Sequence, residues 1–242
     1  MTQEMLLPSL WDDAHAATLD EPGKLLYRSN LLGSDLRITN FGGGNTSAKV
    51  AARDPLTGAD VTVLWVKGSG GDIGSMKLDG FATLCMDKLM QLRAQYRALD
   101  QEDAMVEALG HCIFNLNPRA PSIDTWLHGF VPHIHIDHVH SDAVIALAAA
   151  KDQVRLTAEV FGGEIGYLPW QRPGIDLGIR LGRMAEDDPA LKGVVLGSHG
   201  LFTWGATAKE CYEETLRIIN KAAVWLEANV KRPVFGGEKV KA

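Results

Sequence analysis

The chain of 242 residues has few cysteines, no excess of positive charge and no long apolar run. Cys85, Cys112 and Cys211 are odd in number and show no CxxC spacing, which argues against a disulfide framework and against a thiolate zinc site. Lysine and arginine total 24 against 30 aspartate and glutamate residues. The resulting net charge of −6 offers no basic surface for nucleic acid or for an anionic membrane.

No apolar segment approaches the roughly 18 residues that a membrane span needs, and the N-terminus lacks the basic-then-apolar order of a signal peptide. The nucleotide-binding fingerprints are missing as well. The GxGxxG pattern fails at Ser47 in the first glycine-rich segment and at Ile73 in the second, and GxxxxGK[ST] is absent. We therefore expect a cytoplasmic protein with no nucleic-acid partner, no membrane partner and no Rossmann or kinase site.

What the sequence does contain is an ordinary globular composition, with 46% hydrophobic and 22% charged residues. Helical and strand patterns alternate along the chain, which predicts one α/β domain over residues 1–242. The tail from Phe235 to Ala242 has no clear structural stop, so a natural C-terminus and the N-terminal portion of a longer protein both stay open.

Caps, breakers and periodicity place the expected elements. We expect helices over residues 9–17, 20–33, 81–96, 102–112, 122–130, 143–150, 176–187 and 207–230. Strands are expected over residues 46–50, 61–66, 133–139, 194–196 and 201–204, and shorter strand and turn segments over 154–167.

Five of the 8 histidines lie within thirteen residues, from His128 to His140. Within this cluster the H-x-H pair His138 and His140 places two imidazoles on one face of a strand, where they can bind a divalent metal such as zinc. Two surface histidines on a half-exposed strand are the alternative. The pair His133 and His135 has the same spacing, but in an unbroken strand His135 faces away from His138. We therefore expect neither of that pair to be a ligand.

A third ligand is needed, because catalytic zinc usually keeps three protein ligands and one open position. His199 is the candidate, since it lies beside Gly200 at a strand–turn–strand corner from which a side chain can project into a cleft. We expect His15 and His111 to be structural or exposed.

Two further patterns carry polar groups. Asp124 and His128 stand four residues apart, so on a helix they share a face; the pair is either a local ion pair or N-cap, or a general acid/base near the metal. Residues 44–47 and 68–70 offer backbone N–H groups and hydroxyls that can hold a phosphate or carboxylate, although ordinary tight turns have the same composition. Ser122 adds one more hydroxyl just ahead of Asp124.

Taken in chain order, these pieces resemble the class II aldolase/adducin family. The order is a GN-x-S turn, a strand ending in Ser-Gly, an S-x-[ED]-x-x-x-H segment, H-x-H, and a later strand ending in His-Gly; here these are residues 44–47, 69–70, 122–128, 138–140 and 199–200. The phrases around residues 41–47, 65–74 and 115–125 are most similar to the rhamnulose-1-phosphate aldolase part of bifunctional aldolase/dehydrogenase proteins.

The resemblance implies a three-layer α/β/α fold with a central, mostly antiparallel sheet. It also implies a homotetramer with sites between subunits and a divalent metal, most often Zn²⁺. Carried over residue by residue, it assigns the metal ligands to His138, His140 and His199 and the acid/base role to Asp124. It assigns binding of a phosphorylated sugar to Asn45, Ser47, Ser69, Gly70 and Ser122.

Two positions depart from the family pattern. Asp124 stands where the small-sugar aldolases generally carry Glu, which shortens the acid/base side chain by one methylene group. Ile123 stands where a second Ser is common, which removes a hydroxyl from the phosphate site. Because GxGxxG is absent, we expect no dehydrogenase half in these residues.

The function implied by the resemblance is a metal-dependent aldolase. It would cleave a ketose 1-phosphate of the rhamnulose 1-phosphate type to dihydroxyacetone phosphate and a small aldehyde by an enediolate mechanism. The same site could serve a pentulose-phosphate 4-epimerase, a dehydratase or a decarboxylase. A metal-free interaction domain, as in adducin, is the alternative outside enzymes, although such a domain should lose the ligand histidines that are present here.

Overall fold

The computed structural model describes residues 6–40, 43–114, 116–117 and 119–230. Among these residues, seven strands form one sheet in the order β3-β2-β1-β4-β7-β6-β5. The β5–β6 pair is parallel, and the other neighbouring pairs are antiparallel. The strands are β1 (Asn45–Arg53), β2 (Asp60–Lys67), β3 (Phe81–Cys85), β4 (His135–Val139), β5 (Ile165–Leu168), β6 (Gly193–Leu196) and β7 (Gly200–Gly205).

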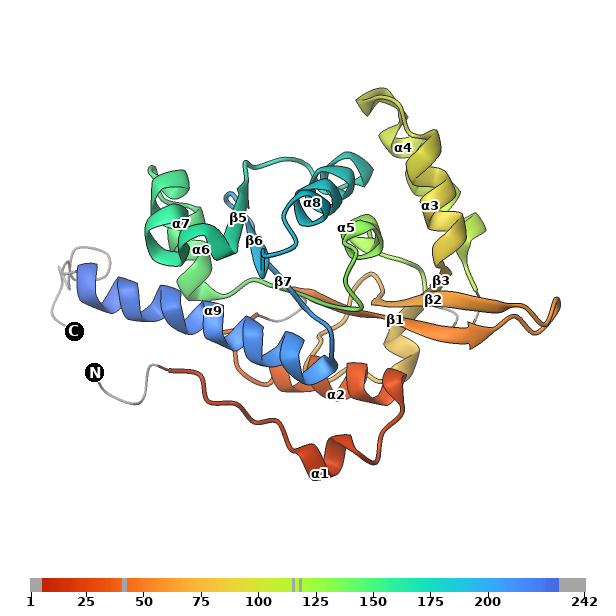
Figure 1. The fold of residues 1–242 in the computed structure, drawn as a ribbon, viewed down its shortest axis with the longest axis horizontal. Coiled ribbons are helices and arrows are strands. Elements are labelled where there is room, and N and C mark those ends of the chain that lie inside the picture. The colour runs from red at the N-terminus through yellow and green to blue at the C-terminus, as the bar shows by residue number, and fades with distance from the viewer. Residues whose placement is uncertain (1–5, 41–42, 115, 118, 231–242) are drawn as a thin grey trace, which may run out of the picture.

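Helices cover both faces of the sheet, so the fold has three layers (Figure 1). One face packs against α3, α5 and α8, and the other packs against α2, α6, α7 and α9. The helices are α1 (Asp13–Ala16), α2 (Glu21–Gly33), α3 (Met86–Gln95), α4 (Glu102–Ala108), α5 (Thr125–Phe130), α6 (Asp142–Ala148), α7 (Gln153–Phe161), α8 (Ile175–Asp187) and α9 (Ala208–Asn229). Short 3-10 turns occur at Leu78–Gly80, Leu99–Gln101, Leu109–Cys112 and Gly162–Glu164.

The central strand β4 is buried over its whole length because a helical layer covers each side. Side chains alternate along a strand, so Ile136 packs in the core under α5 and α8, whereas Val139 packs in the core under α6 and α9. The mixed α/β, mostly antiparallel architecture expected from the resemblance is confirmed. None of the helices in the described ranges is long and apolar enough to span a bilayer.

Three expected elements were placed wrongly. Residues 81–85 form β3, because Phe81 to Leu84 are fully or almost fully buried and pair with β2; the helix begins only at Met86. Residues 153–161 form the helix α7, whose Leu156 and Phe161 are buried against neighbouring helices. The first helix begins at Asp13 because the Asp12 carboxylate caps it.

A buried ion pair ties α2 to β4. The Arg28 guanidinium lies 2.8 Å from the Asp137 carboxylate, and both side chains are fully buried. Arg28 also donates to the carbonyl oxygen of Ser47 on β1, and Thr215 on α9 donates to Asp137. The pair therefore joins two strands and two helices on the sheet face opposite α5.

Candidate metal centre and active site

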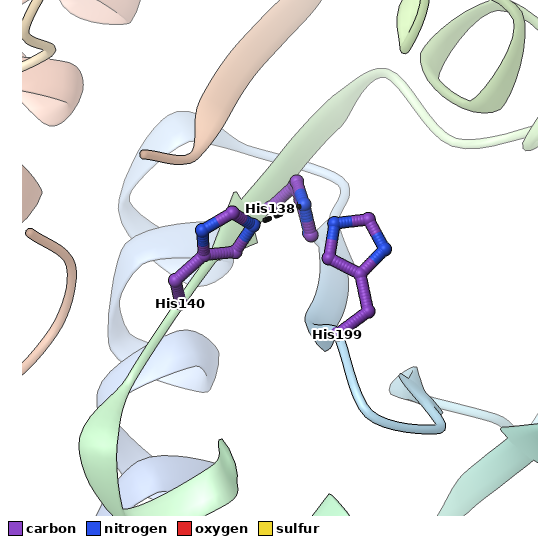
Figure 2. Close-up of side chains that lie close together, drawn as sticks. All are labelled: His138, His140 and His199. Atoms are coloured by element: carbon purple, nitrogen blue, oxygen red, sulfur yellow. Dashed lines mark hydrogen bonds between the residues drawn. The ribbon is translucent and has the colours of Figure 1, made fainter. Parts of the chain in front are cut away.

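The structure brings together the three histidines that the sequence singled out. His138 is on β4, His140 follows the strand directly, and His199 lies in the turn between β6 and β7 (Figure 2). The antiparallel pairing of β4 with β7 sets His138 opposite Phe202, which brings the turn alongside. One ligand nitrogen from each ring lies within 4.8 Å of those of the other two.

Hydrogen bonding fixes which nitrogen of His138 is available. Its Nδ1 lies 3.0 Å from the Leu201 carbonyl oxygen, so Nδ1 carries the proton and Nε2 is left with its lone pair. That Nε2 lies 3.0 Å from the Nε2 of His140. Two nitrogens bound to one tetrahedral zinc at about 2.0–2.1 Å lie about 3.4 Å apart, so the separation suits two ligands of one ion.

Burial keeps these rings neutral, as a metal ligand must be. Burial lowers the pKa of His138 well below its usual range, and the neighbouring charges of His140 and His199 lower it further. Burial likewise lowers the pKa of His140 and of His199, whereas the Asp124 carboxylate acts in the opposite direction on both. The donor set therefore fits a divalent cation, and three imidazoles suit zinc among others.

Glycine allows the close approach of chain segments at this site. A Cβ on Gly200 would lie 2.7 Å from the Val139 carbonyl oxygen and 3.2 Å from Cε1 of His138, so a larger residue would push the turn away from the histidines. In the same turn, Ser198 has φ 53°, a left-handed conformation that is costly for a residue other than glycine. The position of His199 is thus held by backbone geometry as well as by strand pairing.

Asp124 is at the N-cap position of α5, but its side chain makes no cap hydrogen bond. Instead Oδ2 accepts a 2.6 Å hydrogen bond from the Asn45 amide, and Oδ1 is buried with no hydrogen-bond partner. Its charge acts on His140 and on His199, which places the carboxylate on the histidine side of α5. An unpartnered carboxylate oxygen at this place is available to accept a proton from a bound molecule.

Asp124 and His128 do share one cluster, but Asn45 connects them. His128 is fully buried, and its Nε2 lies 2.5 Å from the Asn45 Oδ1 while its Nδ1 lies 2.7 Å from the Ser47 hydroxyl. Burial lowers the pKa of His128 to about 3, so the ring is neutral. The side chains of Asn45 and Ser47 are used inside the protein, and their predicted contact with substrate stays a prediction.

The other predicted substrate-binding groups lie in the loop after β2 and in the segment just ahead of α5. Ser69 and Gly70 are exposed in the loop after β2, and the Ser69 N–H donates to Ala120 just before the Asp124 segment. The Ser122 hydroxyl accepts a 3.2 Å hydrogen bond from the Asp124 N–H. These hydrogen bonds join the loop after β2 to the segment that carries Asp124, and the substrate-binding role of its residues stays a prediction.

One charged residue was missed from the sequence. Lys67 ends β2 directly before the exposed loop and is only 5% exposed. Burial lowers the pKa of its ammonium group, and the nearby Asp124 charge partly opposes that effect. A lysine at the end of a buried strand and directly ahead of Gly68-Ser69-Gly70 is a sequence pattern that could have indicated a charged residue of the anion-binding loop.

The remaining clustered histidines lie elsewhere. His135 points to the opposite face of the sheet, where its Nε2 lies 3.8 Å from Glu21 of α2. The ring of His133 stacks on Trp204 at a centroid distance of 5.2 Å. Neither belongs to the three-histidine group.

Comparison with known proteins agrees with this geometry. The family model described as Class II Aldolase and Adducin N-terminal domain matches residues 24–226. An uncharacterized oxidoreductase, YuxG of Bacillus subtilis (strain 168), is 36% identical over 236 residues, which are 97% of this chain and 34% of that protein. The chain thus spans about a third of the length of this curated relative.

Solved structures give the same picture. The N-terminal class II aldolase domain of a conserved protein from Thermoplasma acidophilum has 30% sequence identity and a TM-score of 0.78, covering 93% of this chain and 100% of that one. L-fuculose-1-phosphate aldolase from Thermus thermophilus shares the fold at 14% identity, with a TM-score of 0.55 over 86% of this chain and 96% of that one. The chain belongs to the class II aldolase and adducin family.

Proposed function

We propose that this chain is a divalent-metal-dependent lyase. It cleaves a ketose 1-phosphate of the rhamnulose 1-phosphate type to dihydroxyacetone phosphate and lactaldehyde. The observation that carries the proposal is the set of three neutral histidines beside a carboxylate with a free, buried oxygen. A homotetramer with sites between subunits is part of the same proposal.

In this mechanism His138, His140 and His199 hold the metal. When bound, a divalent cation supplies Lewis-acid polarisation of the ketose carbonyl and its neighbouring hydroxyl. Asp124 Oδ1 accepts the proton of the hydroxyl on the far side of the bond that breaks. The carbon that carried this hydroxyl becomes the aldehyde carbonyl carbon. The electron pair of the broken carbon–carbon bond stays with the three-carbon fragment, and Asp124 then returns a proton to that fragment.

In this proposal the loop after β2 binds the phosphate. The exposed loop offers the Ser69 hydroxyl and the Gly70 backbone N–H, and Lys67, two residues before Ser69, adds a positive charge. The attraction between this charge and the phosphate compensates for the hydrogen bond that a serine at the position of Ile123 would have donated. Binding of the phosphate orients the reacting carbons toward Asp124. Binding energy from this remote group thus contributes to the rate through orientation.

The test is release of dihydroxyacetone phosphate from rhamnulose 1-phosphate, followed by coupled reduction with NADH. We expect a chelator to abolish turnover, zinc to restore it, and His199→Ala to behave like the metal-free protein. His111→Ala, at an exposed histidine, is the matched control and should keep wild-type turnover. Full turnover without metal would overturn the metal role, and an unimpaired Asp124→Asn enzyme would overturn the acid/base role.

The same assay separates the alternatives. A 4-epimerase, dehydratase or decarboxylase with this ligand set would consume its sugar without releasing the three-carbon ketose. A protein that binds no metal and turns over no sugar would instead be an adducin-like interaction domain.

A further inference from the structure

Four polar side chains form a chain of hydrogen bonds beneath the site. The Ser47 hydroxyl lies 2.7 Å from His128 Nδ1, His128 Nε2 lies 2.5 Å from Asn45 Oδ1, and Asn45 Nδ2 lies 2.6 Å from the Asp124 carboxylate. Asn45 and Ser47 are two residues apart on β1, so both face α5, which carries His128. The chain therefore crosses from the sheet to the helix and ends at the proposed acid/base.

Donors and acceptors can be arranged in one way along this chain. The ionised Asp124 carboxylate only accepts, so Asn45 must turn its NH₂ group toward it and its oxygen toward His128. His128 Nε2 must then carry the proton, and on a neutral ring Nδ1 has none. Nδ1 accordingly accepts from the Ser47 hydroxyl, which is the terminal donor.

The consequence falls on Asp124. If the Asn45 amide turned over, its oxygen would face the carboxylate oxygen, and two acceptors would repel at hydrogen-bond distance. With the amide held, Oδ2 is fixed and Oδ1 is left without a partner. An aspartate reaches less far than a glutamate, so the direction of this oxygen matters for contact with substrate.

We propose that His128 is a positioning residue: it fixes the orientation of the Asn45 amide, and through it the reactive oxygen of Asp124. His128 is fully buried and cannot touch substrate itself. This inference rests on the proposed function of Asp124, but it concerns the hydrogen-bond order, which can be read without turnover.

A purely structural role would predict something different. The His128 ring also packs 5.3 Å from Phe202, so its loss can destabilise the protein without affecting Asp124. Two amide variants separate these effects. The amide of His128→Gln reaches the position of Nε2 and can donate to Asn45, whereas that of His128→Asn reaches only the position of Nδ1 and can contact Ser47.

We expect His128→Asn to lower kcat about 100-fold with KM changed less than about threefold, as a misplaced catalytic group does. His128→Gln should recover most of kcat, and both variants should bind the same amount of metal. In an Asp124→Asn background, His128→Asn should cause little further loss of kcat, because the two act as one unit. The proposal is overturned if His128→Gln and His128→Asn lose the same fraction of kcat and this loss follows the fall in their thermal midpoints.

A spectroscopic measurement separates this proposal from the proposed function. Long-range ¹H–¹⁵N NMR spectra of the wild-type metal-loaded protein should show His128 as the Nε2–H tautomer, and His128→Gln identifies the signals. The Nδ1–H tautomer would overturn the positioning role whatever the activity. If the tautomer is Nε2–H but rhamnulose 1-phosphate is not cleaved, the proposed function fails and the hydrogen-bond order stands.

Discussion

The buried Arg28–Asp137 pair allows a sharp prediction of stability. Both side chains are fully buried, and their charged atoms lie 2.8 Å apart. Replacing Arg28 by Met keeps an unbranched side chain in the core but removes the charge, which leaves the Asp137 carboxylate without its counter-charge. The substitution also removes the hydrogen bond that Arg28 donates to the Ser47 carbonyl group.

The expected loss is large because an unpaired buried charge is costly. Breaking such a pair by removing one partner costs about 3–5 kcal/mol, a sizeable part of the roughly 5–15 kcal/mol that holds a domain folded. For a chain of this length, 1 kcal/mol shifts the thermal midpoint by about 2–4 °C, so a fall of at least about 6 °C should be measured. Circular dichroism during thermal and urea unfolding is the assay.

Two controls make the measurement decisive. Arg172 and Asp103 also form a 3.0 Å pair but are 67% and 84% exposed, so Arg172→Met should leave the midpoint almost unchanged. The double variant Arg28→Met/Asp137→Leu removes both charges and should recover more than half of the loss. If Arg28→Met is no worse than Arg172→Met, or if the double variant is no better than the single one, the reasoning is refuted.

Three more outcomes follow from the structure. Gly44 has φ +72° and a Cβ there would lie 2.7 Å from the His138 carbonyl oxygen, so Gly44→Ala should cost more than the about 1–3 kcal/mol of backbone strain alone; Gly58→Ala, with φ +69° and no atom nearer than 3.7 Å, is the control, and equal losses in urea unfolding would disprove the clash. Burial lowers the pKa of His135 from 6.5 to about 3. Below 6.5 the unfolded chain therefore binds a proton that the folded chain does not, and stability is lost as the pH falls toward 3. His135→Leu should flatten the dependence of unfolding free energy on pH by up to about 1.4 kcal/mol per pH unit, and an unchanged slope would contradict this. Zinc at 100 times its dissociation constant should stabilise the protein by about 2.7 kcal/mol; His199→Ala should lose this shift in calorimetry, and a shift retained by the variant would exclude it as a ligand.

Local pattern was enough to predict most of the helices and strands, whereas their three-layer arrangement came from the resemblance to the family. Long amphipathic segments such as α8 and α9, and the apolar strands β2 and β6, have periodicities that need no distant partner to identify. The failures were β3, α7 and the start of α1. The fate of Phe81 to Cys85 depends on pairing with β2, which local periodicity does not report. The apolar residues of α7 fit a helical and a strand periodicity about equally well. Their packing against α9 makes the segment a helix.

The site divides in the same way. His138 and His140 were identified because strand alternation is local, and chain order supplied His199 as the third member. The link between Asn45 and Asp124 spans 79 positions, so no local pattern could show it. Lys67 was overlooked because a charged residue at a strand end usually points to solvent, whereas here it is only 5% exposed.

The central strand β4 explains why the histidine cluster divides. Its odd-numbered side chains face α2 and α9, where Asp137 meets Arg28, and its even-numbered side chains face α5, where His138 meets Phe202. A shift of β4 by one residue would exchange these two faces and turn His138, a proposed metal ligand, toward α2. The ion pair on one face therefore favours this register of the strand, and the same register places His138 on the other face. The hydrogen bond between His138 Nδ1 and the Leu201 carbonyl group is made within the protein, so β7 as well as β4 sets the direction of this ring.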